Sequence, residues 1–183
     1  MKFVLRTSEV KFALHFAVRR NFTHKVNLTI EDNFTCPKGK LSFSVFSVKD
    51  NTLKVLAFLE TIVGNQVADI YLGGYGEFDE FAYCCCKEYK KTHPNISLIF
   101  ITPYMTEDYQ KNHLSCQQKR YDGILYPEIE DKPLKFAITY RNRWMVEKAD
   151  YIVACVNHTW GGAYKTYKHA KKIGKVIINL GNI

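Results

Sequence analysis

From residue 50 onward, the chain alternates between two hydrophobic patterns. Short apolar runs predict buried strands over residues 68–72, 97–101, 151–156 and 176–178. Apolar residues at helical spacing predict helices over residues 53–63, 77–91, 136–148 and 163–172. This alternation is typical of an α/β fold, in which helices cover both faces of a mostly parallel sheet. We therefore expect a three-layer sandwich.

The first 49 residues show a less regular pattern. Residues 40–48 (KLSFSVFSV) alternate as a strand does and could form the first strand of the sheet, whereas residues 7–20 fit a helix. Residues 21–39 resemble a loop, and residues 103–134 form a second turn-rich stretch. We expect two parts, an atypical and partly irregular N-terminal extension over residues 1–38 and a folded domain over residues 39–183.

The composition is that of a globular protein. Of 183 residues, 46% are hydrophobic and 24% are charged, which excludes a disordered chain, a collagen-like repeat and a minimal disulfide scaffold. No apolar run is long enough to predict a transmembrane helix, so we expect no membrane association. Basic residues scattered through positions 2–20 are unlike a signal peptide, and we therefore expect a cytoplasmic protein.

The formal net charge of +8 is unevenly distributed. Residues 1–50 hold nine Lys or Arg against four Asp or Glu, whereas residues 51–183 hold seventeen against fourteen. A basic surface attracts anions such as nucleotides or nucleic acid, although it can also serve only to keep a protein soluble. Nucleic-acid binding through the N-terminal part is therefore one hypothesis.

Two glycine turns follow predicted strands and precede predicted helices. The first contains Gly73, Gly74 and Gly76, and the second contains Gly161 and Gly162. Backbone N–H groups at such turns form anion sites, and ligands of open α/β sheets bind at the carboxyl ends of strands. We expect the two strands to be neighbours and the two turns to hold one nucleotide-like ligand.

Charged residues give the two turns opposite electrostatic character. Acidic residues follow the first turn, and among them Asp79 would accept hydrogen bonds from the hydroxyls of a ribose. Lys165 and Lys168 follow the second turn and would attract a phosphate. His158 precedes the second turn, where it could act as an acid–base group or remain an ordinary loop histidine.

Arg141 and Arg143 begin the helix before the third predicted strand. Their guanidinium groups could bind a phosphate, or they could pair with acids such as Glu147. Trp144 could stack on a base or pack in the core. Cys84, Cys85 and Cys86 point in different directions on one helix, so we interpret the three as core residues and expect neither a metal nor a cofactor.

The stretch GGYGEFDEFA and the region from YDGILYPEIEDKPLKF to KKIGKVIINL resemble the DUF1273/YpsA-like proteins of the SLOG superfamily. The resemblance covers about residues 50–180 and implies a Rossmann-like fold that binds a nucleotide or nucleotide-derived ligand at its glycine turns. The superfamily also contains the Lonely Guy phosphoribohydrolases and the DNA-processing protein Smf. The resemblance to this superfamily also implies that a homodimer is plausible.

Two departures from the superfamily pattern bear on activity. Where relatives carry a Gly-His-Arg motif after the first strand, residues 47–50 read Ser-Val-Lys-Asp, which implies an altered pocket wall. In the alignment with the Lonely Guy hydrolases, their arginine falls on Arg141 and their catalytic glutamate falls on Lys168. A lysine cannot replace a carboxylate beside an oxocarbenium-like centre.

The leading hypothesis is a binding or sensing domain for a nucleotide-derived ligand. The alternatives are an N-glycosidic hydrolase of nucleoside phosphates, which would use a carboxylate of the first turn, and a nucleic-acid-binding protein. The expected ligand-binding residues are Gly73, Gly74, Gly76, Asp79, Arg141, Arg143, His158, Gly161 and Gly162.

Overall fold

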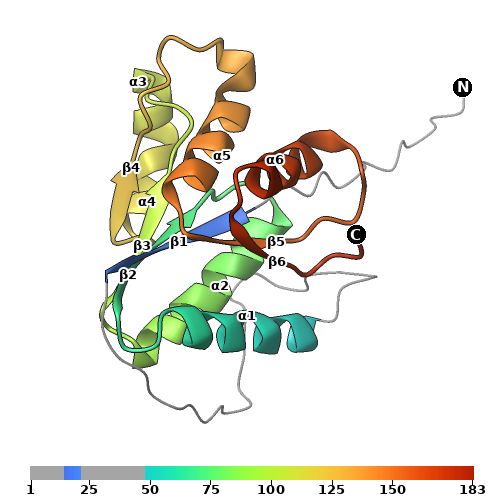
Figure 1. Ribbon diagram of the computed structural model, residues 1–183. Coiled ribbons are helices and arrows are strands. Elements are labelled where there is room, and N and C mark those ends of the chain that lie inside the picture. Colours follow the sequence, from blue (N-terminus) through green and yellow to red (C-terminus); the bar gives the residue numbers. More distant parts are fainter. Residues whose placement is uncertain (1–14, 22–47) are drawn as a thin grey trace, which may run out of the picture.

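The computed structural model describes residues 15–21 and 48–183, and these form an α/β sandwich (Figure 1). Its six-stranded sheet has the order β4-β3-β2-β1-β5-β6. The strands are β1 (His15–Asn21), β2 (Val67–Leu72), β3 (Ile96–Ile101), β4 (Gly123–Leu125), β5 (Tyr151–Ala154) and β6 (Val176–Asn179). The expected Rossmann-like α/β class is confirmed.

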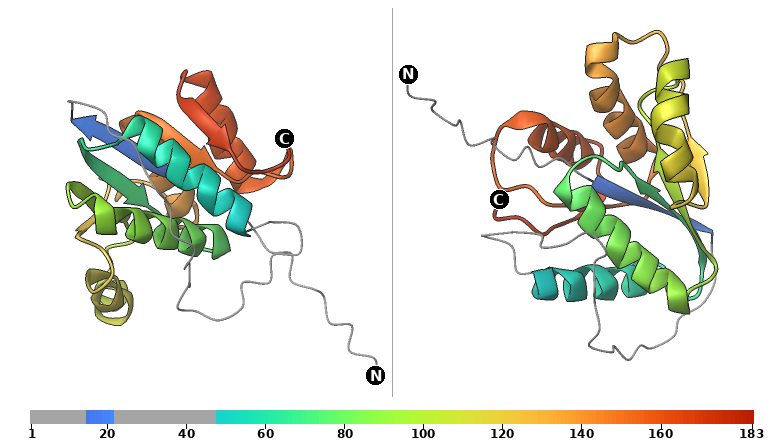
Figure 2. Two further views of the ribbon diagram at one scale, coloured as in Figure 1. Left: turned by 90° about the horizontal axis from the view of Figure 1, so that it is seen from below. Right: turned by 180° about the vertical axis from the view of Figure 1, so that it is seen from behind.

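Helices cover both faces of the sheet. They are α1 (Val48–Ile62), α2 (Glu77–Thr92), α3 (Glu107–Tyr109), α4 (Ser115–Gln118), α5 (Ala137–Lys148) and α6 (Gly161–Lys172). A π-helical turn η1 (Gln110–Leu114) joins α3 to α4, and a 3₁₀ turn η2 (Leu134–Phe136) precedes α5. Figures 1 and 2 show α1 and α2 on one face and α5 and α6 on the other.

The central strands are apolar because both of their faces are covered. On β2, Ile70 and Leu72 pack in the cluster beneath α1 and α2, whereas Tyr71 faces Met145 and Val146 of α5. All of these side chains are buried. Near-continuous apolar strands are the usual signature of this burial on both sides, and the pattern identified β2, β3, β5 and β6 correctly.

The position of β1 differs from the sequence-based expectation. The helix predicted over residues 7–20 is wrong at residues 15–20, because these residues form a strand that runs antiparallel to both β2 and β5. Hydrogen bonding to a neighbour on each side overrides the local helical pattern. The strand predicted over residues 40–48 ends at Val48, where α1 begins, and its other residues lie outside the described part of the chain, as does most of the predicted N-terminal extension.

Residues 103–134 hold more structure than the turn-rich sequence predicted. They contain the helical segment from α3 to α4, and also β4, which pairs in parallel with β3 at one edge of the sheet. A strand of three residues leaves almost no periodicity in a sequence. Its place is set by tertiary pairing, with Ile124 opposite Phe100.

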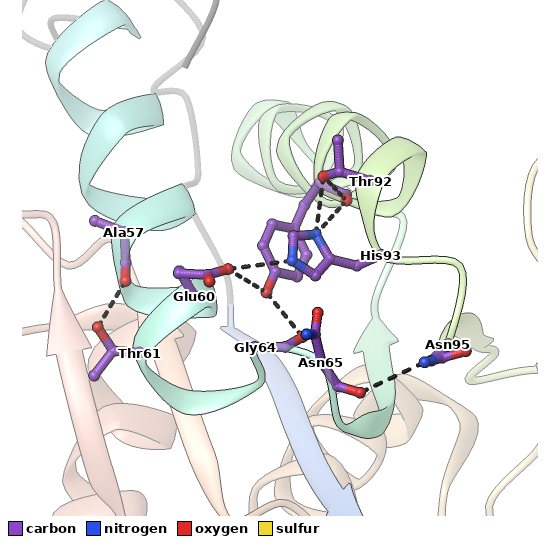
Figure 3. A network of polar contacts seen from close by, with 9 residues as sticks. Ala57, Glu60, Thr61, Gly64, Asn65, Thr92, His93 and Asn95 are labelled. Atoms are coloured by element: carbon purple, nitrogen blue, oxygen red, sulfur yellow. Dashed lines mark hydrogen bonds and ion pairs between the residues drawn. The ribbon is translucent and has the colours of Figure 1, made fainter. Parts of the chain in front are cut away.

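The ends of α1 and α2 are joined by the polar network of Figure 3. The buried His93 ring lies 3.2 Å from a Glu60 carboxylate oxygen through Nε2, and its Nδ1 lies 3.0 Å from the Tyr89 carbonyl oxygen. The hydroxyl of Tyr89 donates to the same Glu60 oxygen, and the Tyr89 ring stacks on His93 with centroids 3.9 Å apart. These contacts fix the two helices at the end of the sheet opposite the glycine turns.

The three consecutive cysteines are core residues, as predicted. Cys85 and Cys86 are fully buried and Cys84 is nearly so, all within the cluster beneath α1 and α2. Burial raises the pKa of the Cys86 thiol well above its ordinary value. Among the described residues, no helix is long and apolar enough to cross a membrane.

Candidate functional site

The first glycine turn lies where β2 ends, and two of its glycines are required by close neighbours. Gly74 has a φ of 71°, and a Cβ there would collide with the ring of the buried Phe100. A Cβ at Gly73 would collide with Nη1 of Arg141 and would lie 3.1 Å from Oδ2 of Asp79. The turn therefore needs glycine partly because two charged side chains, one from α2 and one from α5, reach its backbone.

Asp79 and Arg141 are buried but incompletely hydrogen-bonded. Both have 1% or less of their surface exposed. Asp79 accepts a hydrogen bond from the Tyr75 amide through Oδ2, and Arg141 donates from Nη1 to the Ile101 carbonyl at 3.1 Å. Asp79 Oδ1 and Arg141 Nε and Nη2 have no hydrogen-bond partner among the described residues. Polar atoms without partners are rare in protein interiors and often mark functional positions.

Burial shifts the charge balance of this pair. It raises the pKa of Asp79 to about 8, although Arg141 and the Tyr75 amide oppose the shift. Burial also lowers the pKa of Arg141, and the nearby Asp79 works against that change. An arginine guanidinium stays protonated at neutral pH, so at pH 7 the cluster combines a neutral carboxyl with a cation. Its net charge is positive.

Aromatic side chains cover the cluster. The Arg141 guanidinium lies 5.3 Å from the centre of the Tyr75 ring, and the Tyr75 hydroxyl lies 2.6 Å from that of Tyr109. Tyr109 in turn packs against Tyr104 and His113. We call Tyr75 and Tyr109 the tyrosine cover. Sequence reasoning missed it because its two members are 34 residues apart and no local pattern links them.

The acidic residue next to Asp79 belongs to a different and complete ion pair. Glu80 accepts two hydrogen bonds from Arg120, each of 2.8 Å. The Arg120 guanidinium also lies 4.1 Å from the centre of the Tyr83 ring. Burial alone would lower the pKa of Arg120, but the hydrogen-bonded Glu80 carboxylate raises it. This pair fixes α2 to the chain after α4.

Arg143 does not join Arg141. Residues two apart on a helix project from different sides, and Arg143 lies exposed beside α6, with Nε 3.7 Å from Glu147. The predicted alternative, pairing with an acid, therefore applies to Arg143. Trp144 packs against Tyr71 with ring centroids 5.8 Å apart, so it is a packing residue in this structure.

The second glycine turn lies at the same end of the sheet but not on a neighbouring strand. The expectation of adjacent strands is wrong, because β1 separates β2 from β5. Two interstrand spacings place these strands about 10 Å apart. Gly161, with a φ of 86°, Gly162 and His158 are exposed. The His158 ring stacks on Trp160 with centroids 5.2 Å apart.

The structure thus brings together five of the nine predicted ligand-binding residues. They are Gly73, Gly74, Gly76, Asp79 and Arg141, which meet at the first turn. The other four lie on the β5 and α6 side of β1. Within residues 15–21 and 48–183, no group of three or more His, Cys, Asp or Glu could hold a metal ion. No family model matches the chain, and no curated protein matches it in sequence.

Proposed function

We propose that the first glycine turn binds a nucleotide or nucleotide-derived ligand, and that Arg141 contacts its phosphate. The observation that carries this proposal is the buried guanidinium beside Gly73, two of whose nitrogens have no hydrogen-bond partner in the described part of the chain. Leaving a buried charge without partners is strongly destabilising. A phosphate offers oxygens in the planar, two-pronged arrangement that a guanidinium prefers. The ligand would therefore complete a set of hydrogen bonds that the protein leaves open.

The surroundings support an anionic ligand with hydroxyl groups. The turn lies at the carboxyl end of β2, where open α/β sheets bind ligands, and α2 begins directly after it. At pH 7 the protonated Asp79 leaves the charge of Arg141 uncancelled. The unpartnered Oδ1 of Asp79 remains able to contact a ligand hydroxyl.

Access to Arg141 requires the tyrosine cover to open, because the guanidinium is fully buried. The hydroxyls of Tyr75 and Tyr109 are joined by one hydrogen bond, and a single hydrogen bond contributes about 1 kcal/mol. Opening would break this hydrogen bond and separate the Tyr75 ring from Arg141, and the freed tyrosine rings could pack against a base. His158 and Gly161, on the far side of β1, would contact the opposite end of an extended ligand.

Isothermal titration calorimetry tests this proposal. The ligand set is AMP, ADP, ADP-ribose, cyclic AMP, cyclic GMP and inorganic phosphate. The wild type is expected to bind at least one phosphate-bearing nucleotide, Arg141→Met to lose that binding, and Arg120→Met to retain it at a temperature where the variant is folded. Absence of binding across the set, or equal binding by Arg141→Met, would contradict the proposal.

A second candidate function is hydrolysis of an N-glycosidic bond, favoured by the protonated state of Asp79. A buried carboxyl with a pKa of about 8 can act as a general acid at neutral pH. Water would attack the anomeric carbon, the carbon–nitrogen bond would break, and Asp79 would donate its proton to the leaving base. The attacking water would release one proton to solvent as it becomes the product hydroxyl, and solvent would return a proton to Asp79. Release of free base from a nucleoside monophosphate, lost in Asp79→Asn, would support this activity. Binding without base release would exclude it.

A further inference from the structure

Within residues 51–183, the positive charge is concentrated on one structural unit, the α5–β5–α6 region with its flanking turns. Residues 132–175 contain ten Lys or Arg and two Asp or Glu, a net charge of +8 that equals the charge of the whole chain. Residues 51–131 contain seven basic and twelve acidic residues, a net charge of −5. Apart from the buried Arg141, all the basic residues of the 132–175 region are at least partly exposed. This region therefore has a strongly basic surface.

A groove of about 350 Å³ lies within this surface, between α5 and α6. The two helices pack side by side on the same face of the sheet (Figure 1). We call this the α5–α6 groove, and its lining residues are Phe136, Thr139, Tyr140, Arg143, Lys165, Thr166 and His169. It lies outside the cluster around Arg141, which faces the first glycine turn.

Cations and aromatic rings are interleaved along the groove. Arg143 makes only a long contact with Glu147, so most of its donors remain available, and Lys165 makes no ion pair with a described residue. His169, which lines the groove, lies 3.0 Å from a Glu147 carboxylate oxygen through Nε2. Phe136 is 46% exposed, and the ammonium group of Lys135 lies 5.0 Å from the centre of its ring. The groove surface is mainly apolar and includes the side chains of Arg143 and Lys165, and this combination suits a ligand that carries both planar bases and phosphates.

We propose that the α5–α6 groove binds single-stranded nucleic acid. A single nucleotide could engage Arg143 and Lys165, but it would leave most of the surrounding charge without a counterpart. Lys135 precedes the groove residue Phe136, and Lys168 precedes the groove residue His169. Both lysines are exposed and can contact successive phosphates. Phe136 and Tyr140 supply rings on which bases stack without sequence preference. This function is independent of ligand binding at the first glycine turn.

Fluorescence anisotropy with a labelled twelve-residue oligo(dT) and a matching oligo(U) tests the proposal. The double variant Arg143→Gln/Lys165→Gln should bind about 20-fold more weakly at 100 mM salt, because each lost single-strand phosphate contact lowers the salt slope by about 0.7. Phe136→Ala should weaken binding about tenfold through the loss of base stacking. Both sites are on the surface, and an unchanged circular dichroism melt verifies that each variant is folded.

A matched control distinguishes the contribution of the groove to affinity from the contribution of net charge. Lys54 on α1 and Lys119 after α4 are exposed lysines outside the groove. Lys54→Gln/Lys119→Gln removes the same charge and should reduce affinity less than threefold. Equal losses in the two double variants would overturn the proposal, as would absence of binding.

Three further outcomes would also overturn it. Loss of binding in Lys38→Gln/Lys40→Gln, with the groove variant unaffected, would place nucleic acid on the N-terminal segment. Equal affinity for a poly(glutamate) of matched charge would indicate general attraction of polyanions. Tighter binding to a duplex of the same length would exclude a site built for single strands.

Discussion

Two neighbouring acidic residues on α2, Asp79 and Glu80, each lie near an arginine, and the two environments are opposite in character. Glu80 and Arg120 make two hydrogen bonds of 2.8 Å at a partly exposed position. Asp79 and Arg141 are fully buried, and three of their polar atoms have no partner among the described residues. Two pairs one residue apart thus divide into a complete contact and an incomplete one.

This difference in hydrogen bonding distinguishes a charged pair that stabilises the fold from one that serves a function. A complete pair holds elements together, as Arg120 holds the chain after α4 against α2. An incomplete buried pair destabilises the protein and is retained where a ligand or a reaction needs it. The comparison therefore assigns Arg120 to folding and Arg141 to function, and each of the following predictions tests that assignment.

The largest expected effect is on ligand affinity. Arg141→Met should lower the affinity for the bound nucleotide more than 100-fold, because charged hydrogen bonds contribute about 1.5–3 kcal/mol each. Its free energy of unfolding should fall by less than about 1 kcal/mol, since an apolar side chain replaces an unsatisfied buried charge. Calorimetry and urea denaturation measure the two quantities. A large loss of stability with unchanged affinity would reverse the assignment.

The second expected effect is on the free energy of unfolding when the hydrogen-bonded Glu80–Arg120 pair is removed. Arg120→Met should lower the free energy of unfolding by about 2 kcal/mol, because Glu80 loses two charged hydrogen bonds and Tyr83 loses its cation contact. Glu80→Gln is the matched variant, and it should lower stability by less because an amide oxygen still accepts from Arg120. Urea denaturation at pH 7 provides both values. An Arg120→Met variant as stable as wild type would show that this contact contributes nothing.

The third effect is a pH dependence specific to Asp79. Its pKa is raised from 3.8 to about 8 by folding, so its contribution to stability is greatest below about pH 4 and is lost as pH rises toward 8. The slope is at most about 1.4 kcal/mol per pH unit. The difference in unfolding free energy between wild type and Asp79→Asn should follow this trend between pH 5 and 8. A difference that is flat over this range would show that Asp79 is ionised in the folded protein.

The smallest effect concerns the tyrosine cover. Tyr109→Phe removes the hydrogen bond between the two hydroxyls and should favour the open form by about 1 kcal/mol, which tightens ligand binding by up to about fivefold. Tyr104→Phe leaves that hydrogen bond in place and serves as the control. Titration calorimetry measures both affinities. Weaker binding in Tyr109→Phe would indicate that the hydroxyl contacts the ligand directly.

The sequence predicted the parts of the fold that depend on local patterns. Buried strands such as β2 and amphipathic helices such as α2 carry their periodicity in the chain itself. The strand β4 and the antiparallel β1 were not predicted, because each is defined by the strands that it joins. Pairing across the sheet lies outside what a window of neighbouring residues can show.

The candidate site was predictable in composition but not in geometry. Glycine preference and charge identified Gly73, Asp79 and Arg141, which the structure brings together. Residues two apart on a helix project from different sides, so Arg141 and Arg143 could not both face the turn. Applied to the sequence, this spacing rule would have removed Arg143 from the predicted site. The cover formed by Tyr75 and Tyr109 depends on a contact between distant segments, so only the folded structure reveals it.

The most direct test of the account observes the two arginines separately while the ligand is added. In ¹⁵N–¹H spectra, the Nε–H signals of Arg141 and Arg120 can be assigned by their absence from Arg141→Met and Arg120→Met. Titration with the tightest-binding nucleotide should shift the Arg141 signal downfield as its unpartnered nitrogen gains an acceptor, and the Arg120 signal should stay in place. An Arg141 signal that does not move while the protein becomes saturated with ligand would contradict the central claim.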